Sequence, residues 1–411
     1  MLENVKLLRS LAWKYLEIGK SDRNIQNVKL HTAVNDLKQI RPVVLIDELP
    51  WAELNINNEL TLQISDPFLR NIEWFFRSAI YKNKYVPADM IVLPFVPVQK
   101  TVRSTEIGIR SEDEVLATNK ENSIVSHKYN DVLKSEEDLE KLKLPVLTYD
   151  KVETFRQFNL LGEILGDILP IKLTGVDAFC IYPWDDIARY RGVTNLLIDL
   201  ADRPEFMHKI VQKLTDINLS VLQQYEALEL LDGTCYGLHC TPGLTNDLPG
   251  KDFDGEKLTR KNIWGRGAAQ IFASVSKGMH DEFDIEYMKQ TIGKCGLAYY
   301  GCCEPLDKKI DIVEKIPNLR KISITPWADV NIAAEAIGKR FVLSSKPNPA
   351  SVAVGILDKE VLKKEISTIL DACKRNDCHV DIVLKDISTC NKRPENIFEW
   401  EQTVMEMVKN Y

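Results

Sequence analysis

The sequence predicts an α/β protein built as a (β/α)8 TIM barrel, with an N-terminal helical extension and one insertion. The chain has 411 residues, of which 45% are hydrophobic and 27% charged, a composition typical of folded globular proteins. Short apolar runs alternate with helical patterns along most of the chain, which indicates parallel strands joined by right-handed crossovers. Eight such runs can be recognised, and eight is the number of strands in this barrel class.

The chain divides into an extension, a barrel and an insertion. Residues 1–40 form the predicted helical extension, because Leu8, Leu11 and Tyr15 recur on one helical stripe among charged residues. The barrel is expected to occupy residues 41–411. The stretch 100–148 is polar and irregular, and it is therefore predicted to be an insertion in the barrel.

The strands are predicted from apolar runs that end in polar residues. The first runs from Pro42 to Ile46, and Ser65, Asp66 and Pro67 then mark a helix start. The other strands are expected at Ile91 to Val98, Leu173 to Tyr182, and near 234–239, 297–302, 320–325, 341–345 and 379–385. An open doubly wound sheet is the alternative, but no Gly-rich turn follows the first strand.

Net charge, hydropathy and cysteine content limit the partners, the localisation and the disulfide content that we expect. The net charge of −7 disfavours nucleic acid and anionic membranes, which clustered Lys and Arg recognise. We expect a cytoplasmic protein, because no window has the roughly 18 apolar residues of a spanning helix and the N-terminus lacks a secretory pattern. The nine cysteines are too sparse for a disulfide scaffold. A homo-oligomer is compatible with the sequence.

The strongest candidate site combines two predicted strand ends, since barrel active sites lie at the carboxyl ends of strands. The sequence YYGCCEP (299–305) places Cys302, Cys303 and Glu304 at one end, and His239 with Cys240 ends the preceding predicted strand. These side chains offer a His/Cys/Cys or His/Cys/Glu set for zinc, with Glu304 as ligand or acid/base. Because neighbours in a strand point oppositely, His239 and Cys303 are the preferred pair. Buried cysteines that merely fill space are the alternative.

Other strand ends and one loop supply candidate substrate contacts. An aromatic wall is expected from Trp184, Tyr300 and Trp327, although large residues also plug barrel mouths. Asp185 and Asp186 could bind an amine, act as acid or base, or cap a helix. The remaining candidates are two residues that flank the long loop 241–262 and two strand-end lysines able to bind a carboxylate: Asp247, Arg266, Lys346 and Lys385.

Several segments resemble the uroporphyrinogen decarboxylase superfamily, specifically its corrinoid-dependent methyltransferase branch from anaerobic bacteria. They cover most of the chain and are RPVVLIDELPW (41–51), VSHKYND (125–131), EEDLEKLKLP (136–145), RGVTNLLIDLADRPEFMHK (191–209), YYGCCEPL (299–306), KPNP (346–349) and KDIST (385–389). The resemblance implies a (β/α)8 barrel, a zinc held by His and Cys, and a separate protein that carries a corrinoid (cobalamin).

The chain departs from that family pattern at the expected ligands. Relatives that methylate a coenzyme thiol carry a His-x-Cys pair and a late Gly-Cys-Gly. Here His239 and Cys240 are adjacent, and the late region reads KDISTC. Cys302, Cys303 and Glu304 are therefore expected to replace the late cysteine.

The expected function is an O-demethylase-type methyltransferase. It would move a methyl group from a small O-methyl compound, such as a phenyl methyl ether, or an N-methyl compound to the Co(I) of a corrinoid protein. Zinc would stabilise charge on the departing atom, and Glu304 or Asp186 would deliver a proton. The alternative is a metal-free decarboxylase of a tetrapyrrole or other poly-acid, which requires a basic cavity. The arginine-bearing N-terminal signature of the true decarboxylase is not seen around 47–51.

Overall fold

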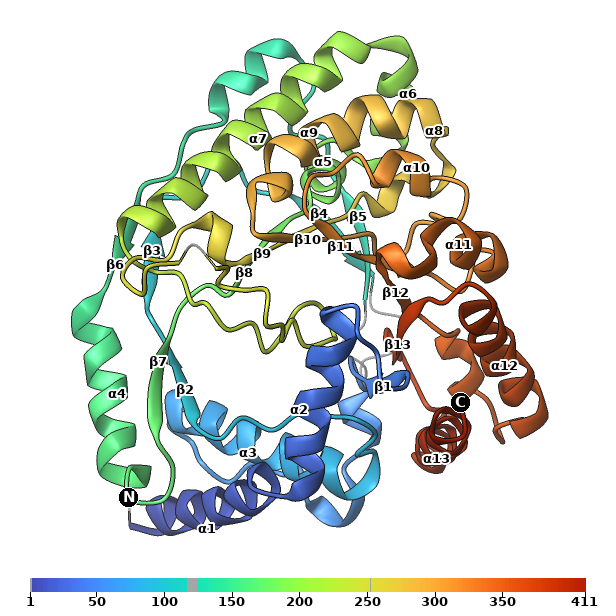
Figure 1. Ribbon diagram of the computed structural model, residues 1–411. Coiled ribbons are helices and arrows are strands. Elements are labelled where there is room, and N and C mark those ends of the chain that lie inside the picture. Colours follow the sequence, from blue (N-terminus) through green and yellow to red (C-terminus); the bar gives the residue numbers. More distant parts are fainter. Residues whose placement is uncertain (1, 117–124, 252) are drawn as a thin grey trace.

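A parallel seven-stranded sheet forms the centre of the protein. The computed structural model describes residues 2–116, 125–251 and 253–411, and Figure 1 shows helices around the outside of the sheet. The strand order is β1-β13-β12-β11-β10-β9-β8, and every pair in it is parallel. The strands are β1 (Val43–Ile46), β8 (Ala178–Ile181), β9 (Trp264–Gly267), β10 (Leu297–Tyr300), β11 (Leu319–Ile324), β12 (Val342–Ser345) and β13 (His379–Leu384). The predicted α/β class with parallel strands is confirmed.

A second parallel ladder continues the ring of strands. β7 (Ile171–Thr174) runs directly into β8 but pairs with β2 (Val96–Gln99). The predicted third strand is thus one bent strand that serves two ladders. The bend requires Gly175, because a Cβ there would lie 2.1 Å from the backbone oxygen of Leu230.

The ring does not close as a barrel of paired strands within the described residues. No ladder joins β1 to β2 there. Asp89, which precedes β2 in the chain, instead connects the two ladders by hydrogen bonds to Val44 of β1. Its backbone N–H donates to the Val44 oxygen at 2.9 Å, and its carboxylate accepts from the Val44 N–H at 2.8 Å. The described residues therefore form a curved parallel sheet, and the closed eight-stranded barrel remains a prediction.

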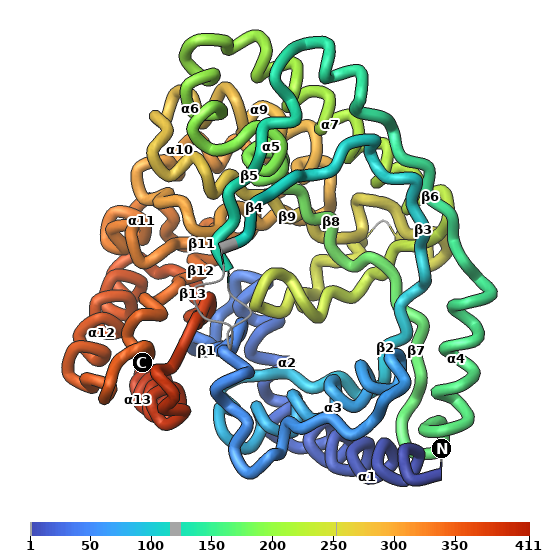
Figure 2. The backbone as a smooth tube through the Cα atoms, turned by 180° about the vertical axis from the view of Figure 1, so that it is seen from behind, coloured from blue at the N-terminus to red at the C-terminus, as the bar shows by residue number. Residues whose placement is uncertain are grey.

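The prediction of a strand near 234–239 is wrong. The ladder position between β8 and β10 belongs to β9 instead. Residues 228–251 belong to a long connection that crosses the space enclosed by the strands and reaches α2 (Figures 1 and 2). There the Asn35 side chain donates to the backbone oxygens of Pro242 and Leu244, both at 2.9 Å. This crossing connection brings His239 to the inner side of the sheet.

Helices cover the outer side of the sheet, and two further helices form the N-terminal segment of the chain. Asp66 caps α3 by accepting from the Leu69 N–H, and Pro67 opens it, as predicted. The helices are α1 (Leu2–Gly19), α2 (Asp22–Asn35), α3 (Pro67–Tyr85), α4 (Lys151–Leu165), α5 (Pro183–Arg191), α6 (Val193–Asp202), α7 (Pro204–Ala227), α8 (Lys277–His280), α9 (Glu286–Gln290), α10 (Ile310–Val313), α11 (Val330–Ile337), α12 (Lys359–Arg375) and α13 (Glu395–Lys409).

The stretch predicted as an insertion contains short antiparallel ladders. β3 (Val102–Ser104) pairs with β6 (Leu147–Tyr149), and β4 (Asp113–Leu116) pairs with β5 (Ser126–Tyr129). The domain boundaries stay a prediction.

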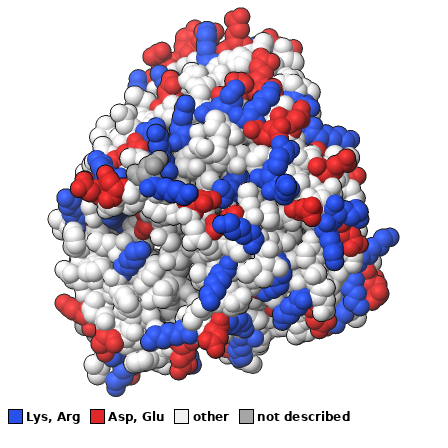
Figure 3. Space-filling model, viewed as in Figure 1, with Lys and Arg blue, Asp and Glu red and all other residues white. Residues whose placement is uncertain are grey.

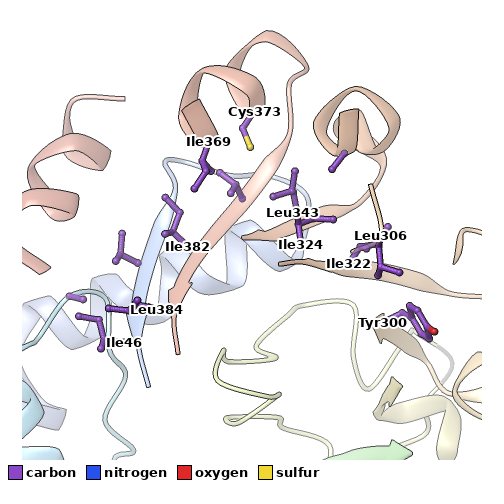
Figure 4. Packing of buried hydrophobic residues seen from close by; sticks show 14 of the residues in the cluster. Ile46, Tyr300, Leu306, Ile322, Ile324, Leu343, Ile369, Cys373, Ile382 and Leu384 are labelled. Atoms are coloured by element: carbon purple, nitrogen blue, oxygen red, sulfur yellow. The ribbon is translucent and has the colours of Figure 1, made fainter. Parts of the chain in front are cut away.

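The two faces of the sheet differ in polarity because side chains alternate along each strand. One set is apolar and packs against the outer helices, as Figure 4 shows for Ile322, Leu343 and Ile382. The alternate set on the inner face is polar and buried, and it includes Lys321 and Asp381. The core therefore lies between sheet and helices, and the enclosed inner space holds the chemistry.

Two surface properties bear on partners. Within the described part of the chain, no helix combines the length and the hydropathy required to cross a lipid bilayer. Figure 3 shows basic and acidic side chains interspersed over one face of the molecule rather than gathered by sign.

Candidate functional site

The site begins with a contact between the crossing connection and the end of β10. The Nε2 atom of His239 lies 3.3 Å from the Sγ atom of Cys302. His239 and Cys240 both have left-handed backbone conformations, with φ of 49° and 64°, which non-glycine residues adopt at a cost. This strain is concentrated where the imidazole meets the thiol, as is common at functional sites.

Both cysteines of the YYGCCEP segment lie beyond the strand. β10 ends at Tyr300, and Gly301 then turns the chain with a φ of 96°. The Sγ atoms of Cys302 and Cys303 are 3.7 Å apart, so the alternation rule for strands does not separate them. Cys302, rather than Cys303, is the cysteine shown in contact with His239. Among the described residues, no hydrogen bond joins Cys240 to these thiols.

Glu304 holds the backbone at this turn. Its carboxylate accepts from the Cys302 N–H at 2.9 Å and from the Ala269 N–H at 3.0 Å, and the residue is fully buried. Because each oxygen is engaged by a backbone donor, Glu304 fits a positioning role for Cys302.

A charged cluster from the ends of β13 and β1 lies beside the thiols. The Nζ atom of Lys385 is 3.8 Å from the Cys302 sulfur, 2.7 Å from Asp386 and 3.6 Å from Glu48. Glu48 and Asp386 also have positive φ, 48° and 56°. Burial and the neighbouring Asp386 raise the pKa of Glu48. These carboxylates are about half exposed, and they mark the solvent side of the site.

The electrostatic environment keeps His239 neutral and makes Cys302 acidic. Burial, together with the positive charges of Arg266 and Lys385, lowers the pKa of His239 to about 2. A hydrogen bond from Cys303 and the charges of Lys385 and Arg266 lower the pKa of Cys302 to about 7. The Cys303 partner has a raised pKa. A neutral imidazole and a thiolate are the forms that bind zinc.

Cys302 is expected to be the most reactive site thiol in metal-free protein. Because its pKa is lowered to about 7, its alkylation by iodoacetamide should reach half-maximal rate near that pH, as the thiolate is the nucleophile. Peptide mass spectrometry across a pH series measures this. Burial raises the pKa of Cys240, so Cys240 serves as the internal control. A Cys302 midpoint as high as that of Cys240 would contradict the electrostatic argument.

The donor spacing fits a zinc ion in part. Ligand atoms about 2.0–2.3 Å from a tetrahedral zinc are separated by about 3.5 Å for a nitrogen–sulfur pair and about 3.8 Å for a sulfur–sulfur pair. The distances of 3.3 Å and 3.7 Å match those edges. Among the described residues, however, no group of three or more His, Cys, Asp or Glu side chains is arranged as a complete metal site. The fit therefore rests on two matched pairs that share Cys302.

Beneath the thiols, the inner face holds a group of buried cations. Arg266 on β9 is fully buried, and its guanidinium lies 4.4 Å from the ring centre of Tyr299. Lys321 forms an ion pair with Asp381 at 2.8 Å. Lys346 donates to the Ser344 hydroxyl at 2.6 Å and lies 6.0 Å from the Tyr299 ring. The predicted substrate residues Arg266 and Lys346 are thus brought to the same ring.

The α5 candidates occupy different positions. Trp184 is buried among Phe272 and Phe283, and its indole N–H donates to the Phe283 oxygen at 3.1 Å. Asp185 accepts from Gln270 at 2.8 Å, and burial, with a contribution from the Glu304 charge, raises its pKa to about 6. Asp186 lies 3.5 Å from Arg189. Of the two α5 carboxylates, Asp185 is the one whose pKa is affected by the charge of Glu304.

The structure does not bring Trp184, Tyr300 and Trp327 together as an aromatic wall. The Tyr300 hydroxyl is buried against His280 and Asp284 on the helix side of the sheet. Trp327 is 69% exposed. Asp247 pairs with Arg320 at 2.8 Å at the far end of the crossing connection. The aromatic rings beside the site are those of Tyr299 and Tyr182 instead.

Sequence reasoning assigned no role to Tyr182, Lys321 and Asp381. The signal that could have found them is the polar residue at every second position of otherwise apolar strands, as in Lys321, Ser323 and Asp381. In a parallel sheet covered by helices, such alternation indicates a polar inner space.

Comparison with known proteins gives little further identification. No family model matches the chain, and no curated protein matches it in sequence. A methyltransferase from Methanosarcina mazei is similar in structure over 92% of this chain and 97% of that chain, with 12% identity and a TM-score of 0.47.

Proposed function

We propose that the protein is a zinc-dependent methyltransferase that moves a methyl group from a small O-methyl or N-methyl compound to the Co(I) of a partner corrinoid protein. The observation that carries the proposal is the contact of 3.3 Å between the His239 imidazole and the Cys302 thiol. The neutral imidazole and the acidic thiol suit a zinc ion. We assign the third donor to Cys303 because its sulfur lies 3.7 Å from that of Cys302. The resemblance of the sequence to corrinoid-dependent methyltransferases supports the partner.

The residues of the chain have separate tasks in this proposal. When bound, zinc supplies Lewis-acid stabilisation of charge on the departing oxygen or nitrogen. Lys385 favours the thiolate of Cys302, and Glu304 fixes its backbone. Asp185 is the best-supported proton donor to the departing atom, because its pKa of about 6 leaves part of the population protonated near neutral pH. Asp186, the donor expected from sequence, pairs with Arg189.

A metal-free decarboxylase of a poly-acid is the second candidate, and the buried cations favour it. The Tyr299 ring is approached by three buried cations, Arg266, Lys321 and Lys346. Lys385 lies beside the Cys302 sulfur. Lys321 is paired with Asp381, and Lys385 with Asp386. Two cations are left without a carboxylate partner among the described residues, which is few for a poly-acid substrate.

An anaerobic assay tests the proposal. Purified protein is analysed for zinc and then mixed with a reduced corrinoid protein and a panel of methoxyaromatic and N-methyl compounds. The expected result is stoichiometric zinc and loss of the Co(I) absorbance with at least one donor, both abolished by a chelator. Decarboxylation that survives chelation would favour the second candidate, and a zinc-free active transferase would overturn the metal assignment.

A further inference from the structure

Arg266 is a buried cation with two unused hydrogen-bond donors. Its Nη1 donates to the Gly267 oxygen, but Nε and Nη2 are buried and have no partner. Within the described residues, no ion pair involves this guanidinium. An unpaired buried charge strongly destabilises a fold, so a protein retains one most readily where a ligand supplies the missing partner.

The two unused donors form one edge of the guanidinium. The Nε and Nη2 hydrogens point in parallel, which is the geometry that binds both oxygens of a carboxylate. The rings of Tyr182 and Tyr299 contact the guanidinium group of Arg266, with ring centres 5.5 Å and 4.4 Å from its central carbon. Such cation–π contacts orient the group without using its N–H donors.

The position of Arg266 links it to the thiol site. The Tyr299 ring beside it is 6.4 Å from the His239 ring. Cys180, which faces Arg266 across the β8–β9 ladder, is exposed, so solvent reaches this part of the inner face. Lys346 adds a second positive charge near Tyr299. The guanidinium therefore lies on the same inner face as the imidazole and the thiol, with the Tyr299 ring between them.

We propose that Arg266 binds a carboxylate of the methyl donor, so that the substrate is a small methylated monocarboxylic acid. The methyl group of this substrate rests on the proposed function, whereas the carboxylate site depends only on Arg266 and the residues around it. The acid is held at its carboxylate between two tyrosines, and its methylated end extends toward His239 and Cys302.

Calorimetric titration of metal-free protein with 4-methoxybenzoate and with its methyl ester tests the site without turnover. The acid should bind, and the ester should bind roughly 10- to 100-fold more weakly, the range expected for loss of charge-assisted hydrogen bonds. Arg266→Met should weaken binding of the acid by a similar factor. Arg340→Gln, which removes an exposed arginine paired with Glu314, is the matched control and should bind normally.

The thermal midpoint separates a ligand-binding Arg266 from a structural one. If Arg266 serves the ligand, removal of its unpaired buried charge should leave the thermal midpoint of Arg266→Met equal to or above that of the wild type. If Arg266 serves the fold, the midpoint of Arg266→Met should fall. Equal affinity of the wild type for acid and ester, absence of binding to the acid, or full binding by Arg266→Met would overturn the proposal. If Arg266→Met does not fold, the comparison of acid and ester in the wild type tests the proposal instead. Arg266→Lys, which keeps the positive charge but loses the paired N–H donors of the guanidinium, then serves as the second variant and should also bind the acid more weakly. Failure of cobalt methylation with intact acid binding would reject only the proposed function.

Discussion

Cys302→Ser is expected to lower bound zinc to less than about one-tenth of the wild-type content. The serine hydroxyl stays protonated at neutral pH, whereas zinc binds the thiolate. Loss of this ligand should reduce methyl transfer by more than the roughly 10- to 100-fold that follows mutation of an outer-shell partner. Elemental analysis of purified protein and the loss of Co(I) absorbance measure the two effects.

A second buried thiol provides the control for this experiment. Cys378 is buried, begins the turn into β13 and donates to the Ala334 oxygen at 3.3 Å. Cys378→Ser should keep its zinc and its activity. His239→Ala should behave like Cys302→Ser, because the two side chains are in contact. Normal zinc content in Cys302→Ser would exclude this thiol as a ligand, and loss confined to Cys303→Ser would transfer the role to its neighbour.

Local patterns were sufficient to predict the alternation of strands and helices in much of the sheet. The apolar runs that became β1, β11, β12 and β13 are short and bounded by polar residues. The sequence placed His239 and Cys302 in one predicted site as two strand ends, but His239 reaches Cys302 from the crossing connection instead. The choice of Cys303 over Cys302 assumed a strand that continues past Gly301, and that strand ends at Tyr300.

The strand β9 could not be predicted from local patterns. Its sequence, Trp-Gly-Arg-Gly, has low strand propensity. Gly265 is needed there because a Cβ would lie 2.8 Å from the Cβ of Ile292, which is a tertiary constraint. The segment 234–239 has the better local pattern but belongs to the crossing connection, which Asn35 of α2 holds at Pro242 and Leu244. Arg266 is buried because it lies in β9, so its burial could not be predicted from the local sequence either.

The face of the sheet to which a tyrosine points depends on its position in the strand, and the residue type does not determine it. Tyr299 and Tyr300 are adjacent and both fully buried. Tyr299 contacts the inner cations, and Tyr300 contacts the outer helices. Trp327 follows β11 by three residues and turns to solvent. Composition at a strand end therefore does not predict which aromatic rings face the inner space.

Asp381→Ala is expected to lower the free energy of unfolding by about 3–5 kcal/mol, the cost of leaving one member of a buried ion pair without its partner. Lys321 and Asp381 are each about 1% exposed and 2.8 Å apart. Asp381 also accepts hydrogen bonds from Thr241 and Ser344. Urea unfolding followed by tryptophan fluorescence measures the change.

The same carboxylate predicts a loss of stability in acid. Burial would raise the pKa of Asp381, but the charges of Lys321 and Lys346 outweigh it and lower the value to about 2. Since the unfolded value is about 3.9, the ionised form stabilises the fold above that pH. The contribution is lost as the pH falls from about 4 toward 2. The difference in stability between wild type and Asp381→Ala should therefore shrink across this window.

A double variant separates the charge effect from packing. Lys321→Met combined with Asp381→Leu removes both charges, and it should recover much of the stability that Asp381→Ala loses. Recovery without zinc binding is expected, because Thr241 loses its 3.0 Å hydrogen bond to Asp381 and lies two residues from His239. A double variant as unstable as Asp381→Ala would show that the hydrogen bonds of the carboxylate, rather than the unpaired lysine, dominate its contribution. The buried ion pair thus couples stability of the inner face to the position of the imidazole.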